Sequence, residues 1–478
     1  MKYPKHRPHA MSRTRIIATL GPSSAKKETI MHMLDAGMSV ARFNMSHGNH
    51  ATHAAHMKTA RAASRASNRP LAILQDLSGP KIRIGELNKE TVDLEEGHSF
   101  TLTTKPCVGD ASHAYVSYRK LPTVVKRGMH IFLNDGKIHL KVTSVTQTDI
   151  RTTIIVGGAI RARRGVNIPD AHFTFSALTP KDKRDVLFGL EQDVDIITLS
   201  FVRSAADIKR LRSLLKKRPH VNIVAKIETK AAVTNLDEII EAADALMVAR
   251  GDLAIEVPPE RVPLIQKQII RAANRAGKPV ITATQMLDSM RVSTVPTRAE
   301  VNDVANAVLD GTDAVMLSDE TAIGLHPAKT VTVMSRIALE TEHDTLFIDR
   351  QDEWDFEPKT TYDAVSRSIV KTARTTKARA IVAFSESGHT GRMVARYRPH
   401  IPILVLTPNR ETFNTSLLTY GCVPVLIHKV KQLKDARTTA KKVLMEHGIC
   451  QPGDVYVLGA GLPFGTPGAT NMMIVVTL

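Results

Sequence analysis

The chain has 478 residues, more than one hydrophobic core usually organises, so we expect two or three domains. Hydrophobic residues make up 43% and charged residues 23%, which is ordinary globular usage, and no apolar run is long enough to cross a bilayer. The formal net charge is +18, but aromatic residues make up only 4%, so we expect a diffusely basic surface with neither nucleic acid nor membrane as partner.

The N-terminal segment 1–15 is basic but lacks the apolar stretch that a secretory signal requires. Cys107, Cys422 and Cys450 lie far apart and form no CxxC pair, which argues against a disulfide framework or a structural zinc site. We therefore expect a soluble protein of the reducing cytoplasm.

Short apolar segments recur along the chain, and each ends in polar residues or glycine before a helical stretch, as in the βα units of a parallel sheet. Gly37, Gly277 and Gly311 follow helical stretches where a left-handed C-cap is needed. Eight segments predict a closed (β/α)8 TIM barrel of the α/β class: 15–22, 39–48, 71–80, 195–201, 222–228, 245–252, 280–285 and 314–320.

Two further regions do not fit the barrel repeat. A long segment after the third strand alternates polar and apolar residues, which predicts an inserted β domain, and five more strands with helices follow the barrel. The predicted division is a first barrel part with the basic N-terminal extension (1–79), an inserted β-barrel lid (80–176), a second barrel part (177–345) and a C-terminal α/β regulatory domain (346–478).

Polar side chains gather at the predicted carboxyl ends of the barrel strands, where TIM barrels build their active sites. Residues i and i+2 of a strand share a face, so Lys226 and Glu228 should point together, although such a pair can also be purely structural. The polar residues at these ends are Arg42, Asn44, Ser46, Asp76, Lys226, Glu228, Arg250, Asp252, Thr284, Ser318 and Glu320.

The residue types at these strand ends favour metal-dependent phosphoryl transfer. Glu228 and Asp252 on neighbouring strands suit Mg²⁺ or Mn²⁺, which take oxygen ligands and complete their shells with substrate and water. Arg42 and Lys226 would neutralise phosphoryl oxygens, the main contribution a protein makes to a loose phosphoryl-transfer transition state.

Several short motifs, each weak alone, occur along the chain in this order: TLGPSS, ARFNMSHG, QDLSGPKIR, AKIE, VARGDLAIE, ATQML, PTRAEVNDVANAVLDG and MLSDET. Together they resemble the pyruvate kinase family over nearly the whole chain. The resemblance implies transfer of the phosphoryl group of phosphoenolpyruvate to ADP, giving pyruvate and ATP in the last step of glycolysis.

The resemblance also implies roles for individual residues. Lys226 is carried over as the electrophilic stabiliser of the phosphoryl group and Arg42 as its second clamp, with Mg²⁺ held by Glu228 and Asp252. Backbone N–H groups around Gly251 and Asp252 would receive the substrate carboxylate, a use that a helix start permits.

Two hydroxyl residues, Thr284 and Ser318, match family positions near the carbon to be protonated, with Thr284 also a substrate contact. Because hydroxyl pKa values are high, relay of a water proton is more reasonable than direct donation. The nucleotide, ADP or ATP, would contact Pro22, Asn44 and Arg83.

A monovalent cation, usually K⁺, is bound in many family members, and the resemblance assigns it to Asn44, Ser46, Asp76 and the Leu77 carbonyl. The family's usual GPEIR is GPKIR here, with Lys81 in place of Glu. A fixed ammonium can replace the field of the ion, so we hypothesise that K⁺ is not required; the alternative is that Lys81 points to solvent.

The segment 385–390, SESGHT, lies between a strand and a helical stretch, where hydroxyls and glycine can cradle a phosphate. Family members resemble it with a sugar-phosphate effector loop, so we expect an allosteric phosphate site at Ser385, Ser387 and Thr390 rather than an ordinary cap. Family likeness also implies a homotetramer.

Two other sequence patterns are weaker evidence for a binding site. GAGLPFG (459–465) has the wrong spacing for a dinucleotide fingerprint, so we expect no NAD binding there. The histidines His47, His50, His53 and His56 could hold a transition metal, but a solvated helix is the better interpretation.

Two rival functions remain open at this stage. The first is a lyase or aldolase that uses the same barrel and carboxylate pair without ADP, although it would not need a lid that excludes water. The second is a basic nucleic-acid-binding protein, which would be retained on DNA in a salt-sensitive manner.

Overall fold

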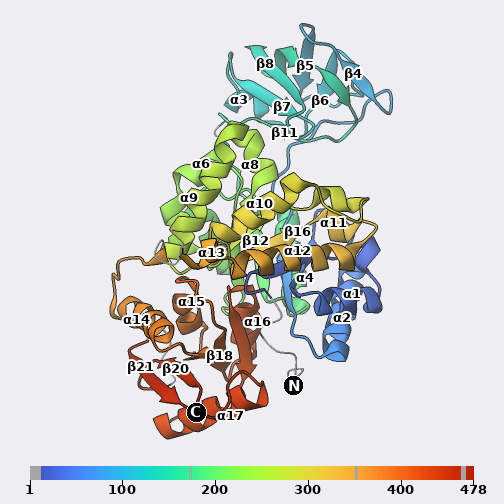
Figure 1. Ribbon diagram of the computed structural model, residues 1–478. Coiled ribbons are helices and arrows are strands. Elements are labelled where there is room, and N and C mark those ends of the chain that lie inside the picture. Colours follow the sequence, from blue (N-terminus) through green and yellow to red (C-terminus); the bar gives the residue numbers. More distant parts are fainter. Residues whose placement is uncertain (1–11, 172, 174, 350–353, 465–469) are drawn as a thin grey trace.

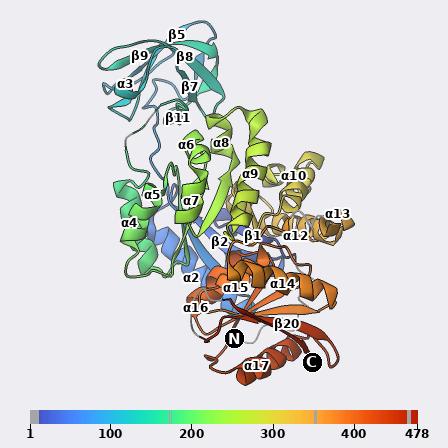
Figure 2. The same ribbon diagram turned by 90° about the vertical axis from the view of Figure 1, so that its left-hand side faces the viewer.

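The computed structural model describes residues 12–171, 173, 175–349, 354–464 and 470–478. A small β region, a central barrel and a C-terminal sheet follow one another along the long axis, with the first and last at opposite ends of the barrel (Figures 1 and 2). Within the described residues, no helix combines the length and apolar character that a membrane crossing needs.

The central barrel closes from eight parallel strands in the order β1-β16-β15-β14-β13-β12-β3-β2, which confirms the predicted TIM barrel. The strands are almost wholly buried on both faces, as expected for a parallel sheet covered by helices. Their bounds are β1 Arg15–Thr19, β2 Met38–Asn44, β3 Ala72–Asp76, β12 Ile196–Leu199, β13 Asn222–Ile227, β14 Ala245–Ala249, β15 Val280–Ala283 and β16 Ala314–Leu317.

Some of the helices that surround the barrel begin at a side-chain cap, and some are followed by a glycine. Capping boxes open α4 at Thr179 and α10 at Thr297, and Gly37, Gly277 and Gly311 all have positive φ, as predicted. The helices are α1 Lys27–Asp35, α2 His50–Ser67, α4 Pro180–Glu191, α5 Ala205–Leu214, α6 Lys230–Thr234, α7 Leu236–Ala242, α8 Arg250–Glu256, α9 Val262–Arg275, α10 Arg298–Leu309, α11 Asp319–Ala322, α12 Pro327–His343 and α13 Thr345–Asp349.

The inserted segment between β3 and α4 folds into a separate small β region with its own core. A six-stranded sheet in the order β11-β7-β8-β9-β5-β6 and a two-stranded β10-β4 pair form it. Alternating buried and exposed residues along β8 and β9 leave one face to solvent. The elements are β4 Val92–Leu94, β5 Ser99–Thr103, β6 His113–Tyr115, α3 Leu121–Val124, β7 His130–Leu133, β8 Ile138–Val145, β9 Asp149–Val156, β10 Gly158–Ile160 and β11 Val166–Asn167.

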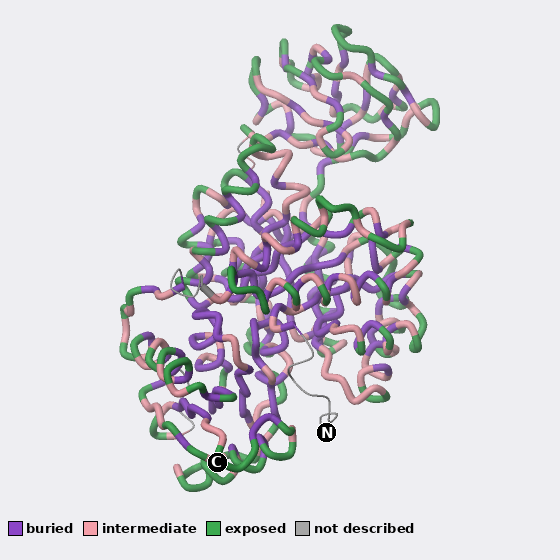
Figure 3. The backbone as a smooth tube through the Cα atoms, viewed as in Figure 1, coloured by how far each residue is buried: buried purple, intermediate pink, exposed green. Residues whose placement is uncertain are grey.

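The C-terminal region is a five-stranded sheet in the order β19-β18-β17-β20-β21, in which only β21 runs antiparallel to its neighbour. Figure 3 shows buried residues running through both the barrel and this sheet. The elements are α14 Thr361–Thr375, β17 Ala380–Phe384, α15 His389–Ala395, β18 Ile403–Thr407, α16 Arg410–Thr415, β19 Cys422–Leu426, α17 Leu433–Glu446, β20 Val455–Ala460 and β21 Met472–Thr477.

The C-terminal region closes the amino end of the barrel. Leu417 and Leu418, between α16 and β19, join the apolar cluster that fills the inside of the barrel, which includes Ile17 and Leu74. The carboxyl ends of the strands, at the opposite end of the barrel, are left free to form a site below the lid.

Candidate active site

Most of the residues predicted at the carboxyl ends of the barrel strands converge on one cavity of about 110 Å³. Lys81, from the chain segment that leads into the lid, also lines this cavity. The predicted residues among its lining are Arg42, Asn44, Ser46, Asp76, Leu77, Lys226, Asp252 and Thr284.

Arg42 and Asp76 form a buried ion pair between β2 and β3. Nε and Nη2 of Arg42 both donate to Oδ2 of Asp76, at 2.8 and 2.6 Å. Nη1 donates to the hydroxyl of Thr19 at 2.8 Å, and that hydroxyl donates to the Leu317 carbonyl. These contacts hold the guanidinium plane at a set angle to the cavity.

Lys226 points into the same cluster, as its strand register predicts. Its Nζ lies 3.1 Å from Glu228 Oε2 and 3.9 Å from Asp76 Oδ1, and it donates to the Ser200 hydroxyl at 2.9 Å. Burial by itself would lower the pKa of Lys226, but Asp76, Glu228 and Asp252 more than offset burial and raise it. The ammonium therefore stays charged at neutral pH.

Glu228 is fully buried and only half satisfied. Its Oε1 accepts the Phe201 N–H at 2.7 Å, whereas Oε2 accepts no hydrogen bond from a described residue although the Lys226 ammonium is near. Burial raises the pKa of Glu228 to about 7, and the nearby Asp252 carboxylate adds to the rise. The Lys226 ammonium lies 3.1 Å from Oε2, and this carboxylate oxygen has a further lone pair with which it could bind a metal ion.

The pair Glu228 and Asp252 fits a hard divalent cation. Mg²⁺ is usually held by one or two carboxylates and keeps the rest of its shell for water and substrate oxygens. Within the described part of the chain, no group of three or more His, Cys, Asp or Glu side chains could hold a metal by itself. A metal ion at these two carboxylates would therefore need water and substrate oxygens as its remaining ligands.

A strained turn after β15 places Thr284 at the cavity. Thr284 has φ 73° and Gln285 φ 53°, a conformation that is rare for a β-branched residue. Arg250 holds the turn by donating to the Thr284 carbonyl at 2.6 Å while it pairs with Asp303. The Gly251 N–H donates to the Thr284 hydroxyl at 2.9 Å, so this amide already has an acceptor.

The predicted monovalent-cation ligands are adjacent but already engaged in part. Asn44 Oδ1 accepts the Ser46 N–H at 3.0 Å, and the Leu77 carbonyl accepts a serine hydroxyl at 2.7 Å. A carbonyl oxygen can accept a second partner, so these contacts lower but do not remove the capacity of the group to hold an ion.

Lys81 is solvent-exposed, yet it lines the cavity and acts on its electrostatics. Burial alone would raise the pKa of Asp76, but Lys226, then Arg42 and with a smaller share Lys81, hold it below its usual value. The Lys81 side chain therefore extends along the site even though water also reaches it.

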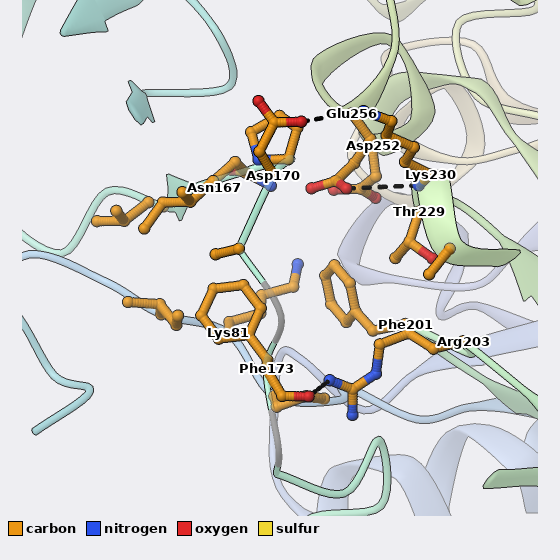
Figure 4. A pocket seen from close by; sticks show the side chains of 18 of the residues that line it. Lys81, Asn167, Asp170, Phe173, Phe201, Arg203, Thr229, Lys230, Asp252 and Glu256 are labelled. Carbon is orange, nitrogen blue, oxygen red and sulfur yellow. Dashed lines mark hydrogen bonds and ion pairs between the residues drawn. The ribbon is translucent and has the colours of Figure 1, made fainter. Parts of the chain in front are cut away.

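A larger cavity, of about 530 Å³, lies between the lid and the barrel mouth. It shares the lining residues Lys81, Phe201 and Asp252 with the smaller cavity, so the two cavities adjoin each other. Figure 4 shows Asp170 facing Lys230 across the larger cavity, and the two side chains form an ion pair of 2.9 Å.

Arg83 lines the larger cavity and donates to the Arg163 carbonyl at 2.9 Å. Sequence reasoning missed three further polar residues of the lid wall, Asp135, Arg164 and Asn167. The basic pair before Gly165 was a readable signal for anion binding, but nothing in the sequence places the lid strands against the barrel mouth.

Pro22 and Ser318 are not among the described residues that line either cavity. Pro22 is exposed at the start of the short helix η2 (Pro22–Ser24). A Cβ on the preceding Gly21 would lie 2.6 Å from the Ala322 carbonyl oxygen, so only glycine fits this approach. Ser318 follows β16, and its N–H donates to Glu320.

The predicted effector residues lie together after β17. The Ser387 carbonyl accepts from the Arg392 guanidinium at 3.0 Å, and the Thr390 hydroxyl is 2.8 Å from that of Thr470. Ser385 is the first residue after the strand. The GAGLPFG segment nearby extends into residue 465, which lies outside the described residues.

The histidine segment is only partly solvated, so the expectation of a solvated helix is wrong for His53. His53 is 7% exposed because it lies on the inner face of α2, and its Nε2 is 2.8 Å from the His47 carbonyl oxygen. His50 Nε2 is 2.8 Å from Asp185 Oδ1. These contacts engage one ring nitrogen of each of the two histidines.

Comparison with known proteins extends the observations on the fold. The family model described as the pyruvate kinase barrel domain matches residues 11–331, and that of the pyruvate kinase alpha/beta domain matches residues 363–476. The chain is 42% identical over 466 residues to a pyruvate kinase of Geobacillus stearothermophilus, covering 96% of this chain and 79% of that protein. It is 38% identical to one of Clostridium acetobutylicum over 97% of this chain and 99% of the other. A crystal structure of a pyruvate kinase from Cryptosporidium parvum superposes with a TM-score of 0.91 at 33% identity, over 98% of this chain and 97% of that one.

Proposed function

This chain belongs to the pyruvate kinase family, and we propose which of its residues transfer the phosphoryl group from phosphoenolpyruvate to ADP. As a phosphotransferase of that family it makes pyruvate and ATP, the last step of glycolysis. One observation carries the assignment of roles: a charged Lys226 lines the cavity and pairs with the buried Glu228 directly behind it.

Lys226 and Arg42 stabilise the phosphoryl group during transfer. Both are fixed by neighbouring carboxylates before substrate arrives, so they need little reorganisation as charge develops on the phosphoryl oxygens. Loss of one such donor typically lowers kcat by about 10²–10³-fold. The Lys226→Met variant should therefore retain its fold and lose nearly all turnover.

Glu228 and Asp252 are the residues that would hold Mg²⁺ or Mn²⁺. When bound, the divalent ion neutralises charge on the phosphoryl oxygens and orients them. Binding can be measured without turnover, by titrating Mn²⁺ into the protein and following the electron paramagnetic resonance of the free ion. Glu228→Gln should weaken Mn²⁺ binding by at least about tenfold, because it removes a charged ligand. Glu256→Gln, in the wall of the larger cavity, is the matched control, and an equal loss in both variants would contradict the assignment.

The carboxylate of the substrate is received at the first turn of α8, around Gly251 and Asp252, where the Gly251 N–H would exchange the Thr284 hydroxyl for a substrate oxygen. Thr284 and Lys226 are further substrate contacts. Thr284, together with Ser318, relays a water proton to the enolate carbon, since a hydroxyl group is too weak an acid to donate unaided.

The nucleotide occupies the larger cavity, with Arg83 near its phosphates; Asn44 would contact it from the adjoining smaller cavity, and Pro22 from outside both cavities. Cationic groups on both walls of the cavity support this assignment. The lid sheet above this space would exclude water, which otherwise competes with ADP for the phosphoryl group.

Lys81 supplies the positive field that K⁺ provides in many relatives, at the site of Asn44, Ser46, Asp76 and the Leu77 carbonyl. The family generally uses Mg²⁺ and K⁺. The share of Lys81 in lowering the pKa of Asp76 supports replacement of the monovalent ion by this side chain. Turnover that vanishes when both Na⁺ and K⁺ are withdrawn would contradict it.

A sugar phosphate regulates the enzyme at Ser385, Ser387 and Thr390. The Arg392 guanidinium beside the Ser387 carbonyl adds positive charge near these hydroxyls. The test is the half-saturation for phosphoenolpyruvate across a panel of sugar phosphates: the active compound should lose its effect in Ser387→Glu and keep it in Ser368→Ala, an exposed serine of α14. Unchanged regulation in Ser387→Glu would refute the site.

The enzyme is a homotetramer with domain limits near residues 79, 176 and 345. Exposed Val292, Val295 and Leu325, and the unpaired outer edge of β21, are surfaces that a second copy would cover. Light scattering coupled to gel filtration should give four chains, and Val475→Lys on β21 should give a smaller assembly. A monomeric wild type would contradict this.

A further inference from the structure

A cavity of about 290 Å³ lies at the end of the C-terminal sheet opposite the SESGHT segment. The segment before β17 and that before β18 form two of its walls, and the last turns of α14 form the third; α14 and β18 are labelled in the lower part of Figure 1. Because Arg379 precedes β17 and Ser385 follows it, the cavity is separated from the predicted effector residues by the length of that strand.

The lining of this cavity combines an apolar floor with a basic rim. The floor consists of Val370, Ala373, Ala378, Pro399 and Ile401. The rim carries Arg374, Lys377 and Arg379, all exposed, and none of the described residues that line the cavity is acidic.

Two of the rim cations, Lys377 and Arg379, have little compensation from the carboxylates of the described residues. Arg379 lies 3.5 Å from Asp454, an exposed pair of the kind that contributes little. Within the described residues, no carboxylate forms an ion pair with Lys377. Basic residues are common near the C-terminus of a helix such as α14, because they complement the helix dipole. The helix dipole alone, however, does not account for a cavity next to these residues.

His400 lines the cavity and lies near the positive charges of Arg13 and Arg374. Both of its ring nitrogens are buried and lack a hydrogen-bond partner among the described residues. Burial, together with the nearby Arg13 and Arg374, lowers the pKa of His400 to about 4, so the ring is neutral near pH 7. An uncharged, unpartnered imidazole beside several cations is an environment that an anion would stabilise.

We propose that this cavity binds a small phosphate monoester with a flat apolar body, the phosphate at Lys377 and Arg379 and the body on the Val370–Ala373 floor. The rim supplies charge-assisted hydrogen bonds, which are the stronger kind, and the floor removes apolar surface from water. The volume is at the lower end of the range for small-molecule sites, which limits the ligand to a compact one. The site is separate from catalysis and from the proposed effector residues.

The test is isothermal titration of the full-length protein with phenyl phosphate and, separately, with inorganic phosphate. Phenyl phosphate should bind more tightly, because only it can cover the floor. Lys377→Glu should weaken phenyl phosphate by at least about tenfold, which corresponds to about 1.4 kcal/mol. Because Lys377 is exposed, both variants should keep the fold of the wild type, and Lys377→Gln is a milder second variant whose binding should be intermediate.

Three control variants separate this cavity from other phosphate sites. Lys441→Glu makes the same charge change on α17 and should bind phenyl phosphate as the wild type does. Ser387→Glu and Lys226→Met alter the proposed effector and active sites and should also leave this binding unchanged. Equal affinity of Lys377→Glu and wild type, or binding lost in Ser387→Glu or Lys226→Met instead, would overturn the proposal.

Discussion

The buried Arg398 network should dominate the attachment of the C-terminal region to the barrel. Arg398 is 1% exposed, and its Nη1 and Nη2 donate to the two carboxylate oxygens of Asp313 at 3.2 and 2.9 Å. Nη2 also donates to Asn274 Oδ1 at 2.6 Å and to the Gly311 carbonyl, and the guanidinium lies over the Tyr420 ring. Replacement by Met would leave the Asp313 carboxylate buried without its cation.

The expected cost follows from that burial. Removing one partner of a buried ion pair destabilises a protein by about 3–5 kcal/mol. With an m-value of roughly 3 kcal/mol/M in urea, Arg398→Met should lower the unfolding midpoint by about 1–1.7 M. Trp354 is the chain's single tryptophan and packs in the same apolar cluster as Tyr420, so its fluorescence reports on this contact directly.

A conservative variant and a surface control sharpen the assay. Arg398→Lys keeps the charge but not the planar set of donors, so its midpoint should lie between those of wild type and Arg398→Met. Arg379→Met removes only an exposed pair with Asp454 and should shift the midpoint by less than about 0.3 M, since such pairs contribute at most about 1 kcal/mol. A midpoint for Arg398→Met equal to that of the control would refute the reasoning.

Three further outcomes are expected. Lys81→Glu should make turnover depend on K⁺, measured as rates in tetramethylammonium and potassium buffers; equal rates in both would count against Lys81 as a substitute cation. Arg42→Lys should lower kcat/KM for phosphoenolpyruvate by about 10–100-fold, because lysine cannot bond Asp76 and Thr19 together; near-wild-type kinetics would exclude the clamp. The unfolding free energy should fall as pH drops from about 6.5 to about 4, because burial lowers the pKa of His389 to about 4 and only the unfolded chain takes up that proton; an equally steep slope in His389→Leu would remove His389 as the cause.

Local pattern was enough to predict the barrel. Its strands are apolar on both faces and end at polar residues or glycine, so their number and order could be recognised before any long-range contact was known. The shared face of Lys226 and Glu228 also followed from the period of a strand, and their 3.1 Å separation confirms that placement.

Contacts between distant segments could not be predicted in the same way. The lid residues Asp135, Arg164 and Asn167 line the larger cavity only because two chain connections set the lid above the barrel mouth. Arg398 and Asp313 are 85 residues apart in sequence, and no periodicity relates them. Such pairings depend on how whole domains dock, which local sequence patterns do not encode.

The histidine segment shows a related limit. The three-residue spacing on α2 gave no indication that His53 would lie on the inner face of the helix, because its neighbours in sequence, Thr52 and Ala54, are both small. The left-handed conformation of Thr284 was equally hidden, since threonine rarely adopts it and only the contact with Arg250 reveals why it does here.

The most direct measurement of the central claim is ATP formation from phosphoenolpyruvate and ADP with Mg²⁺, compared between wild type and Lys226→Met. The assignment of roles predicts ADP-dependent turnover by the wild type and a fall of at least about 10²–10³-fold in a Lys226→Met protein that is still folded, as its cooperative urea unfolding would show. Comparable turnover in both proteins, or pyruvate released by the wild type without ADP, would contradict it.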